Sequence, residues 1–422
     1  MAEKEYLTVS EALQLVLDGV DVLSSETVPL LEALDRVLAQ SVVARDSLPP
    51  FANSSMDGYA VRAADVQGAS REKPVTLRVV GDVAAGSVPV TTLGKDGQTV
   101  RIMTGAPLPD GADAVIPVEE TSEPWRERER PLPDEIDVYR SVDSGDYVRY
   151  PGEDVEAGEE VLPPGHVLRP QEISVLASLG VAEVEVVRRP RVAILATGDE
   201  LIPVNEPLQP GKIRNSNGYA QTAQVKALGA IPVPLGIARD TEEDVRGRLQ
   251  AGLDAGMDLF VSSAGVSVGA YDVVKAVLED EGNVGFWRVR MRPGKPLAFG
   301  TYAGIPYLGL PGNPVSSMVS FERFARPAIL KMAGHEELER PQVTVTMRDD
   351  IYSDGRETYA RAVVERGPDG GYVATTTGSQ GSHIMTSLVK ANALVIVPEG
   401  VKHVPAGDRL LAMMIDWPPT VF

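Results

Sequence analysis

From residue 190 onward, the chain alternates short apolar segments with segments of helical periodicity, and this alternation constrains the fold more than any other feature. The apolar segments lie at 191–196, 231–238, 258–263 and 305–311. The helical segments lie between or after them, at 217–228, 241–255, 272–281 and 314–333. Strands that are apolar on both faces and alternate with helices are typical of a parallel sheet covered on both sides. We therefore expect a central parallel α/β sandwich domain.

The regions on either side of this alternation have a different texture. Two short helices are expected at 8–18 and 29–39, the first beginning with a Thr-x-x-Glu capping box. Short β-rich runs separated by glycine and proline turns fill residues 49–150, and a similar texture returns at 342–417. A chain of 422 residues is also too long for one core. We therefore expect a multidomain protein with a β-rich domain and a C-terminal β-barrel or sandwich beside the α/β domain.

Composition excludes several classes of protein. The formal net charge of −20 argues against non-specific binding to nucleic acid. The chain has no cysteine, which excludes disulfides and thiolate chemistry, and its four histidines form no ligand pair at helical spacing. Any bound metal should therefore be a hard ion held by oxygen atoms. The acidic N-terminus lacks the apolar core of a signal peptide, and no run of 18 apolar residues occurs, so we expect a cytoplasmic protein that does not span a membrane.

Ligands of open parallel sheets bind outside the carboxyl ends of the strands, so the residues that follow each strand are candidate site residues. Two of these loops bring carboxylates, and two are rich in glycine, proline and small polar residues. In strand order, the candidates are Asp199 and Glu200, then Asp240, then Gly265, Ser267, Gly269 and Asp272, and finally Pro311, Gly312, Asn313 and Pro314. We expect all four loops to converge on one crevice.

The two kinds of loop suggest a phosphate and a cation. Glycines let backbone N–H groups approach an oxyanion closely, and the N-terminus of the following helix adds partial positive charge. Carboxylates would repel that anion unless a divalent cation lay between them. Mg²⁺ binds carboxylate and phosphate oxygens together, and would be held by Asp199, Glu200 and Asp240.

The same residues also fit structural roles. Asp240 has capping-box spacing to Glu243, so it could simply start the following helix, and Asp272 could cap its own helix. Asp199 and Glu200 could be solvated carboxylates at a strand end, and the Pro-Gly-Asn-Pro segment could be only a rigid turn. The convergence of four strand ends with complementary groups favours the functional interpretation.

A basic segment stands out in this acidic chain. Residues 288–300 place Arg288, Arg290, Arg292 and Lys295 close together, and a Pro-Gly pair makes the last two flank a tight turn. Clustered cations together with Ser267 would suit a small tetrahedral dianion. The alternative is a salt-bridged surface strand.

Two stretches far from the α/β region are also candidate functional loops. Residues 49–65 contain two prolines, a small polar run and the sequence Met-Asp-Gly-Tyr, and residues 101–115 contain Thr104 followed by proline turns. Composition predicts loops for both, and loops carry binding and catalytic residues more often than regular elements do.

Together these motifs resemble those of the molybdopterin molybdenumtransferase family, to which the C-terminal domain of gephyrin is related. The resemblance runs from about residue 6 to 415, and it is carried by the segments MDGYA, RIMTGAPLPDGADAVIPVEE, GED, ATGDEL, GKIRNSNGY, SSAGVSVGAYD, RPGKP and LPGNPVSS. The chain departs from the family pattern at Ala264, where a second glycine is usual, and at Arg292, where lysine is common. We expect an altered fit at the first position and a retained charge at the second.

The resemblance implies four domains and an elongated homodimer. The predicted domains are an α/β domain (6–24 plus 188–333), a linking domain (25–48 plus 155–187), a β-rich domain (49–154) and a C-terminal β domain (334–422). It also implies the reaction, in which adenylylated molybdopterin and molybdate give molybdenum cofactor and AMP with Mg²⁺ as cofactor. Other molybdenum cofactor enzymes are possible further partners.

The resemblance assigns roles to residues in three regions. Asp57, Thr104 and Asp154 would reach the active site from the β-rich domain of the partner subunit, and Glu200 and Asp240 would act through Mg²⁺. Asp272 would lie near metal or substrate, and the 262–272 loop would line the pterin-nucleotide pocket. Molybdate would be held by Ser267, Arg292 and Lys295, with Arg361 and Ser382 from the C-terminal domain, and Pro296 would be a further substrate-binding residue. Arg356 is the alternative to Arg361.

Three other functions are compatible with parts of this pattern. A molybdopterin adenylyltransferase shares the α/β domain but would not need residues 25–185 or the C-terminal domain. A scaffold of the gephyrin kind would need an extra N-terminal domain and a long linker. A homologue that inserts tungstate stays open, because the two oxyanions have nearly the same size and charge.

Overall fold

The computed structural model describes residues 6–123, 131–263 and 273–417. The chain forms two compact units, one of Met1–Val28, Asp35–Ala39 and Glu185–Phe422, and the other of Pro29–Leu34 and Gln40–Val184. The finer division into four domains stays a prediction. The predicted site residues Gly265, Ser267, Gly269 and Asp272 lie outside the described residues. Within the described ranges, no helix is both long enough and apolar enough to cross a membrane.

The first unit is built around a seven-stranded sheet with the order β1-β18-β20-β21-β17-β13-β16. The four predicted strands are neighbours and run parallel, as β21 (Ile305–Leu310), β17 (Leu259–Ser263), β13 (Arg191–Thr197) and β16 (Ile231–Ala238). Three further strands extend the sheet, namely β20 (Pro296–Tyr302), β18 (Gly282–Val289) and β1 (Tyr6–Leu7). The parallel region is thus confirmed, but β20 runs antiparallel to both β21 and β18, so the whole sheet is mixed.

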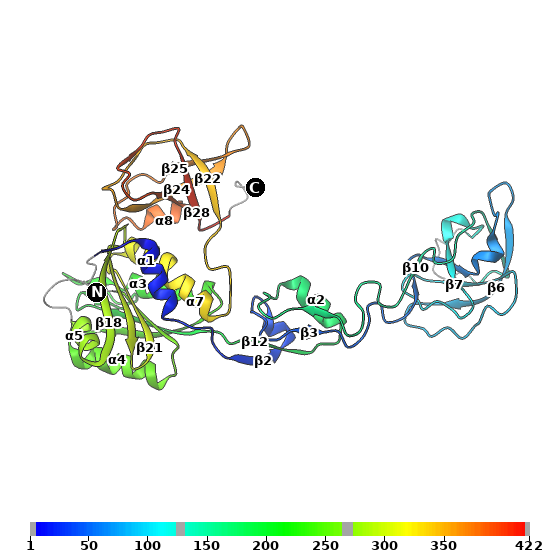
Figure 1. The fold of residues 1–422 in the computed structure, drawn as a ribbon, viewed down its shortest axis with the longest axis horizontal. Helices are drawn as coiled ribbons and strands as arrows, with labels where there is room; N and C mark the ends of the chain where they lie inside the picture. Colours follow the sequence, from blue (N-terminus) through cyan, green and yellow to red (C-terminus); the bar gives the residue numbers. More distant parts are fainter. Residues whose placement is uncertain (1–5, 124–130, 264–272, 418–422) are drawn as a thin grey trace. The chain divides into compact units, whose positions relative to one another are not determined.

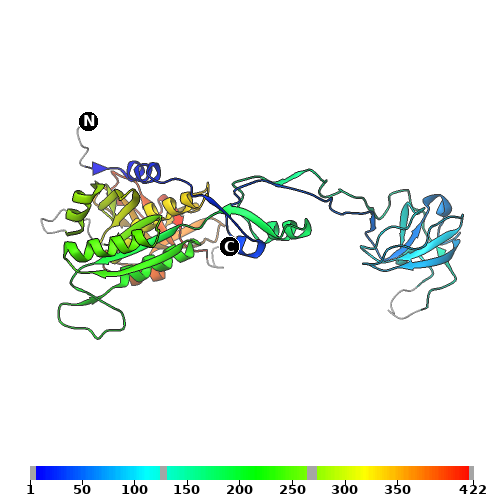
Figure 2. The ribbon, with the colours of Figure 1, turned by 90° about the horizontal axis from the view of Figure 1, so that it is seen from below.

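Helices cover both faces of this sheet (Figures 1 and 2). Alternate residues of β13 point into different cores, with Val192 and Ile194 in one and Ala193 and Leu195 in the other. The first core includes residues of α1 (Val9–Asp18), α3 (Ser216–Ala227), α6 (Pro314–Ser320) and α7 (Arg326–Met332). The second includes residues of α4 (Glu242–Asp254) and α5 (Val273–Glu281). This two-sided burial explains why the strands are apolar along their whole length.

The helix predicted at 314–333 is interrupted by a π-helical turn. The π-helix Phe321–Ala325 lies between α6 and α7. Pro327 follows in the first turn of α7, where it has no N–H to donate and its ring crowds the carbonyl four residues earlier. A widened turn immediately before the proline relieves that crowding.

The C-terminal segment of the first unit is a closed five-stranded β-barrel, as one of the two predicted forms. Its strands are β22 (Gln342–Met347), β24 (Glu357–Arg366), β25 (Tyr372–Thr376), β26 (Ala393–Val397) and β28 (Arg409–Met414). Pairing follows the order β24-β25-β22-β28-β26, and β26 pairs with β24 to close the barrel. Two short strands, β23 (Ile351–Tyr352) and β27 (His403–Val404), pair with each other, and α8 (Thr386–Lys390) precedes β26.

The second unit contains the predicted β-rich region. Its five-stranded sheet has the order β8-β5-β7-β6-β9. The strands are β5 (Gly58–Val61), β6 (Val75–Val83), β7 (Gln98–Ile102), β8 (Ala114–Pro117) and β9 (Glu135–Val138). Short pairs join β4 (Asn53–Ser54) to β10 (Val148–Arg149) and β3 (Val42–Val43) to β11 (Glu160–Leu162), and α2 spans Pro170–Ser178.

The helix predicted at 29–39 is wrong. The structure has strand β2 (Ser25–Pro29), a 3-10 helix at Leu30–Ala33, and then Asp35 at a φ of 61°. Val37 and Leu38 are both buried. Leu38 instead forms a bridge with Val186, so pairing with a distant strand outweighs the local helix propensity.

Candidate functional site

Asp199 and Asp240 meet at the carboxyl ends of β13 and β16. The backbone N–H of Asp199 donates to Oδ2 of Asp240 at 3.2 Å, and the backbone N–H of Asp240 donates to Oδ1 of Asp199 at 3.3 Å. Asp240 is not the cap of α4, because Thr241 takes that place and its Oγ1 accepts from the N–H of Asp244. The capping alternative for Asp240 is therefore wrong, and both carboxylates face solvent at the predicted crevice.

Glu200 lies over Gly198, the glycine that directly follows β13. Gly198 has a φ of 140°, and a Cβ at that position would lie 2.4 Å from Oε2 of Glu200. Glycine suits this position because residues with a side chain rarely adopt such a φ, and a Cβ would also crowd the Glu200 carboxylate. The first strand end thus carries two exposed acidic residues, of which Asp199 lines the crevice.

The carboxylates fit Mg²⁺ only as part of a larger set of ligands. Among the described residues, no group of three or more His, Cys, Asp or Glu side chains is placed to hold a metal ion. Asp199 and Asp240 can offer hard oxygen atoms from two residues. Because Mg²⁺ in proteins usually takes one or two carboxylates and completes its shell with substrate phosphates and water, the pair suits an ion that arrives with a phosphate-bearing substrate.

A cavity of about 1040 Å³ opens beside these carboxylates. Its walls come from β13, the loop after it, α3, β16 and the first turns of α4. They include Gly198, Asp199, Lys212, Asn215, Gly218, Tyr219, Arg239, Thr241, Asp244 and Arg248. Nζ of Lys212 donates to the backbone oxygen of Asp199, so this cation lies close to the acidic pair. The volume is at the upper end of small-molecule sites and is large enough for a nucleotide-sized ligand.

The loop after β21 begins α6 and contacts two other elements. Pro314 is the first residue of α6, Asn313 precedes it, and Pro311 is buried. The backbone oxygen of Gly312 accepts from Nδ2 of Asn217 on α3 at 2.7 Å, and the N–H of Val315 donates to the backbone oxygen of Ser382 at 3.2 Å. This fourth strand end therefore lies between α3 and the barrel loop that carries Ser382.

The basic turn Arg292–Lys295 joins β19 (Met291–Arg292) to β20, whose first residue is Pro296. Gly294 has a φ of 113°, and a Cβ there would lie 2.5 Å from Oγ of Ser320, so a side chain would not fit. Lys295 is exposed, with its Nζ 5.5 Å from the centre of the Tyr6 ring. The turn therefore holds its two cations on a rigid backbone.

Arg361 approaches this turn from β24 of the barrel. It is 1% exposed, its Nε donates to Oγ of Ser387 at 3.1 Å, and its Nη2 donates to the backbone oxygen of Gly381 at 3.1 Å. Burial, and then the positive charge of Arg292, lower the pKa of the Arg361 guanidinium to about 10. It is still charged at neutral pH, and its partners among the described residues are uncharged.

Arg356, the alternative to Arg361, is engaged differently. Its Nε donates to both carboxylate oxygens of Asp354, at 3.2 and 3.1 Å, and its Nη1 donates to the backbone oxygen of Met291 at 3.0 Å. Of these two arginines, Arg361 is buried and has no carboxylate partner among the described residues, whereas Arg356 is paired with Asp354. An anion is attracted more strongly to the first.

In the second unit, Asp57 and Thr104 are brought together. The N–H and Oγ1 of Thr104 donate to Oδ1 of Asp57 at 2.7 and 2.8 Å, and both residues are exposed. Asp154 is also exposed, and its N–H donates to the backbone oxygen of Leu48 at 2.9 Å. No hydrogen bond between described atoms joins Asp154 to the other two residues.

Sequence reasoning missed several residues at these sites. Ser387 and Gly381 hold Arg361, and Lys212 and Asn217 line the crevice or its rim. Lys212 and Asn217 lie within the GKIRNSNGY segment, which carried part of the family resemblance and could have been assigned. Ser387 has no comparable signal, because only the closed barrel brings it to Arg361.

The fold and the sites define a multidomain transferase-like protein with a nucleotide-sized crevice and a separate cluster of cations, of which Arg361 is buried. Three family models match the chain, described as the MoeA N-terminal region (domain I and II) at residues 7–180, a probable molybdopterin binding domain at 193–331, and the MoeA C-terminal region (domain IV) at 344–414.

Individual relatives match along most of the chain. It is 39% identical over 398 residues to a molybdopterin molybdenumtransferase of Nostoc, covering 93% of this chain and 89% of that one. It is 40% identical over 392 residues to molybdopterin molybdenumtransferase 2 of Mycobacterium tuberculosis, covering 91% and 93%. The crystal structure of the molybdopterin biosynthesis moeA protein of Pyrococcus horikoshii matches with a TM-score of 0.80 and 31% identity, over 97% of this chain and all of that one. The chain belongs to the molybdopterin molybdenumtransferase family.

Proposed function

We propose that this chain inserts molybdate into adenylylated molybdopterin and releases AMP. The observation that carries the proposal is that Arg292 and Arg361, from different parts of the first unit, lie close enough for their charges to interact, and that Arg361 is buried with no carboxylate partner among the described residues. Such a site suits a small dianion, because burial strengthens the attraction of each cation for it.

The residues of this chain would bind molybdate, the nucleotide part of the substrate and a metal ion. Arg292, Lys295 and Arg361 hold molybdate, with Ser382 beside them and Ser267 expected from the loop outside the described residues. The cavity beside β16 takes the nucleotide part of the substrate, and Lys212 and Arg239 at its walls bear positive charge toward the phosphates. Positive charge placed near the phosphates stabilises the negative charge that develops as the phosphoanhydride bond breaks.

Asp199 and Asp240, with Glu200 beside them, would hold Mg²⁺ together with the phosphate oxygens. The bound ion would polarise the phosphoanhydride and neutralise charge on departing AMP. Without the ion, the carboxylates would repel the phosphates, so the proposal predicts that AMP release requires it. The two dithiolene sulfurs that take up molybdenum belong to the substrate, which fits a chain without cysteine.

We also propose that the chain acts as a cytoplasmic homodimer, in which Asp57, Thr104 and Asp154 serve the partner's site. Support comes from the family resemblance and from the Asp57–Thr104 pair, which is exposed on the second unit although its hydrogen bonds orient it well. Delivery of the finished cofactor to other molybdenum enzymes is a further proposal on the same basis.

The test is AMP release from adenylylated molybdopterin, with and without molybdate and Mg²⁺, by the wild type and by Asp240→Asn. We expect release that depends on both additions and falls at least about 100-fold in the variant, since a group that binds an essential cation is lost. Asp254→Asn, at the other end of α4, is the matched control, because its carboxylate accepts only from Gln250 of the same helix. A folded wild type that releases no AMP with any oxyanion would refute the proposal.

A further inference from the structure

The segment that carries Arg292 belongs to two parts of the first unit at once. β18 and β20, on either side of it, are strands of the α/β sheet, but β19 pairs with β24 of the barrel. The pairing is parallel, with Met291 opposite Glu357 and Arg292 opposite Thr358, and the N–H of Glu357 donates to the backbone oxygen of Arg290 at 3.0 Å.

This pairing fixes how the two arginines of the anion site lie relative to each other. Arg361 is on β24, three residues after the partner of Arg292. The β19–β24 pairing therefore fixes the backbone of Arg292 relative to the strand that carries Arg361. A shift of β19 along β24 would move one cation against the other, and positioning errors of about 1 Å are enough to lose much of a site's effect.

Hydrogen bonds of Arg356 hold β19 in this register against β24. Its Nη1 donates to the backbone oxygen of Met291 at 3.0 Å, and its Nε and Nη2 both donate to the carboxylate of Asp354. Its own backbone oxygen accepts from Oγ1 of Thr358 at 2.9 Å. All three guanidinium nitrogens thus have protein partners, and one of the partners is the strand that leads into the basic turn.

The charge of Arg356 is already compensated. Asp354 is held by Arg356 above all, and its pKa lies below the usual range for this reason, so the carboxylate is ionised at neutral pH. An oxyanion at Arg356 would have to displace this carboxylate. Within the described part of the chain, Arg361 has no such carboxylate partner, which separates the roles of the two arginines.

We propose that Arg356 is a positioning residue of the oxyanion site: by gripping Asp354 and the Met291 carbonyl together, it sets Arg292 at the correct place relative to Arg361 and does not itself bind the anion. This inference rests on the proposed function, since it assigns the site to molybdate. The positioning role explains why Arg356 lies close to the anion site although it is already paired with Asp354.

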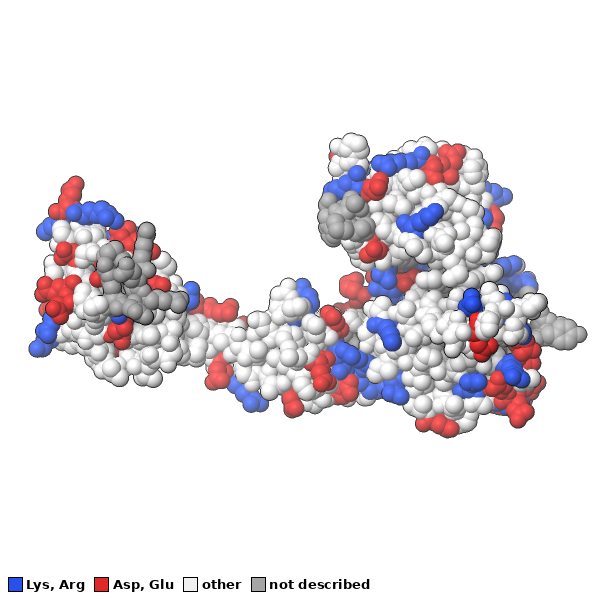
Figure 3. Space-filling model, turned by 180° about the vertical axis from the view of Figure 1, so that it is seen from behind, with Lys and Arg blue, Asp and Glu red and all other residues white. Residues whose placement is uncertain are grey.

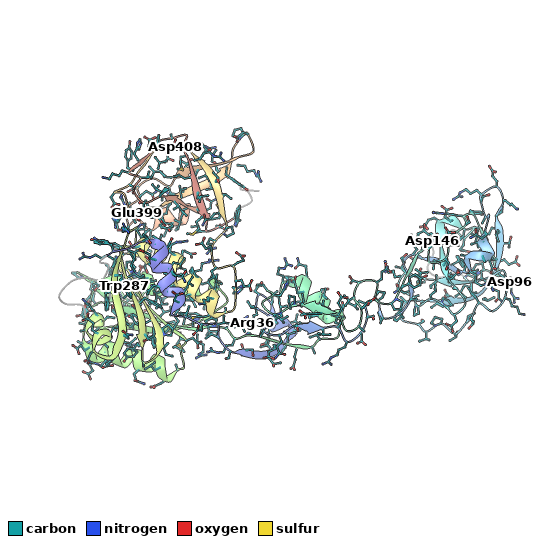
Figure 4. All side chains as sticks on the ribbon, in the orientation of Figure 1. Arg36, Asp96, Asp146, Trp287, Glu399 and Asp408 are labelled. Carbon is teal, nitrogen blue, oxygen red and sulfur yellow. The ribbon has the colours of Figure 1, made fainter. Side chains whose placement is uncertain are left out.

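A second set of contacts, made by Arg290, also holds the segment before β19 in place, so its position does not depend on Arg356 alone. Arg290 forms an ion pair with Glu399 at 2.8 Å, and its N–H donates to the backbone oxygen of Leu7 at 2.8 Å. Glu399 lies on the side of the barrel next to the α/β sheet (Figure 4). Loss of Arg356 should therefore loosen β19 without unfolding the unit.

The experiment measures the dissociation constant of molybdate by calorimetry on the full chain, with melting temperature as a check on folding. The variants are Arg356→Lys, Arg356→Gln and Asp354→Asn. The matched control is Arg348→Gln, which removes another arginine–carboxylate pair of the barrel, that of Arg348 with Glu365 at 3.0 Å. Lysine keeps the charge but cannot reach both Asp354 and Met291 with a planar fork.

We expect both Arg356 variants to bind molybdate about 5- to 30-fold more weakly, to a similar extent, and the control to bind like the wild type. Asp354→Asn should bind no more tightly than the wild type. Full affinity in Arg356→Lys with a loss only in Arg356→Gln would show that charge alone matters and would overturn the inference. So would unchanged affinity in both, or tighter binding in Asp354→Asn, since freeing a ligand arginine would strengthen binding. If the folded wild type itself binds no molybdate, the proposed function fails instead.

Discussion

Replacing Arg361 with methionine should abolish most oxyanion binding without destabilising the protein. Arg361 is 1% exposed, and its guanidinium donates to two uncharged groups among the described residues, Oγ of Ser387 and the backbone oxygen of Gly381. Burying a cation without an opposite charge is costly, and methionine of similar length removes that cost. The loss of two hydrogen bonds of about 1 kcal/mol each acts in the other direction. The two effects offset, so we expect a free energy of unfolding within about 2 kcal/mol of the wild type.

The effect on binding should be much larger than the effect on folding. A charge-assisted hydrogen bond contributes about 1.5–3 kcal/mol, which corresponds to roughly 10- to 150-fold in the dissociation constant. At a molybdate concentration of about 100 times its wild-type dissociation constant, the wild type gains about 2.7 kcal/mol of stability and Arg361→Met about 1 kcal/mol. Thermal unfolding with and without molybdate measures both numbers in one experiment.

Two results would refute this reasoning. If Arg361→Met unfolds far more easily than the wild type without any anion, the guanidinium is a structural group and its burial is compensated. If molybdate stabilises the variant as much as the wild type, Arg361 does not contact the anion. Sulfate at the same concentration is a useful comparison, because it has the same charge and a similar shape.

Two further predictions concern the second unit. Glu172 accepts from the N–H, Nε and Nη2 of Arg169 and lies 3.2 Å from Nε2 of His166, and Arg169 above all lowers its pKa to about 2. Because the folded pKa is depressed, this carboxylate stabilises the unit fully above its ordinary pKa of 4.5, and the contribution fades as the pH falls from there toward 2. Glu172→Gln should lose about 2 kcal/mol at pH 7 and show a flatter pH dependence in this window, as measured by urea unfolding. Thr104→Val removes one bond to Asp57 and should lower AMP release about 10-fold without changing molybdate affinity, whereas Thr76→Val, which removes a similar exposed bond to Asp137, should change neither.

The core of the α/β domain follows from local sequence, because its strands carry their own signal. Strands that are buried on both faces, as β13, β17 and most of β21 are, must be apolar throughout, and helices must follow them to cover the sheet. The carboxyl ends then meet at one edge, which is why Asp199 and Asp240, 41 residues apart, could be expected in one crevice and are hydrogen-bonded there. The closed barrel was anticipated only as one of two forms, since alternating strands do not reveal whether a sheet closes.

What the sequence did not reveal depends on contacts between distant segments. The 29–39 segment has helical periodicity, but Leu38 forms a β-bridge with Val186, and this pairing outweighs the local preference for a helix. The antiparallel placement of β20 and the pairing of β19 with β24 have no short-range signal either. Spacing also could not separate Arg356 from Arg361, which are five residues apart. Their roles differ because Asp354 lies within reach of one and the barrel interior surrounds the other.

The acidity of the chain makes the local arrangement of these arginines decisive. A net charge of −20 disfavours the approach of a dianion, but acidic and basic side chains are interspersed on the face shown in Figure 3, and salt screens exposed charges beyond about 8 Å. Inside a buried site the screening is weaker, so two nearby cations outweigh many distant surface carboxylates.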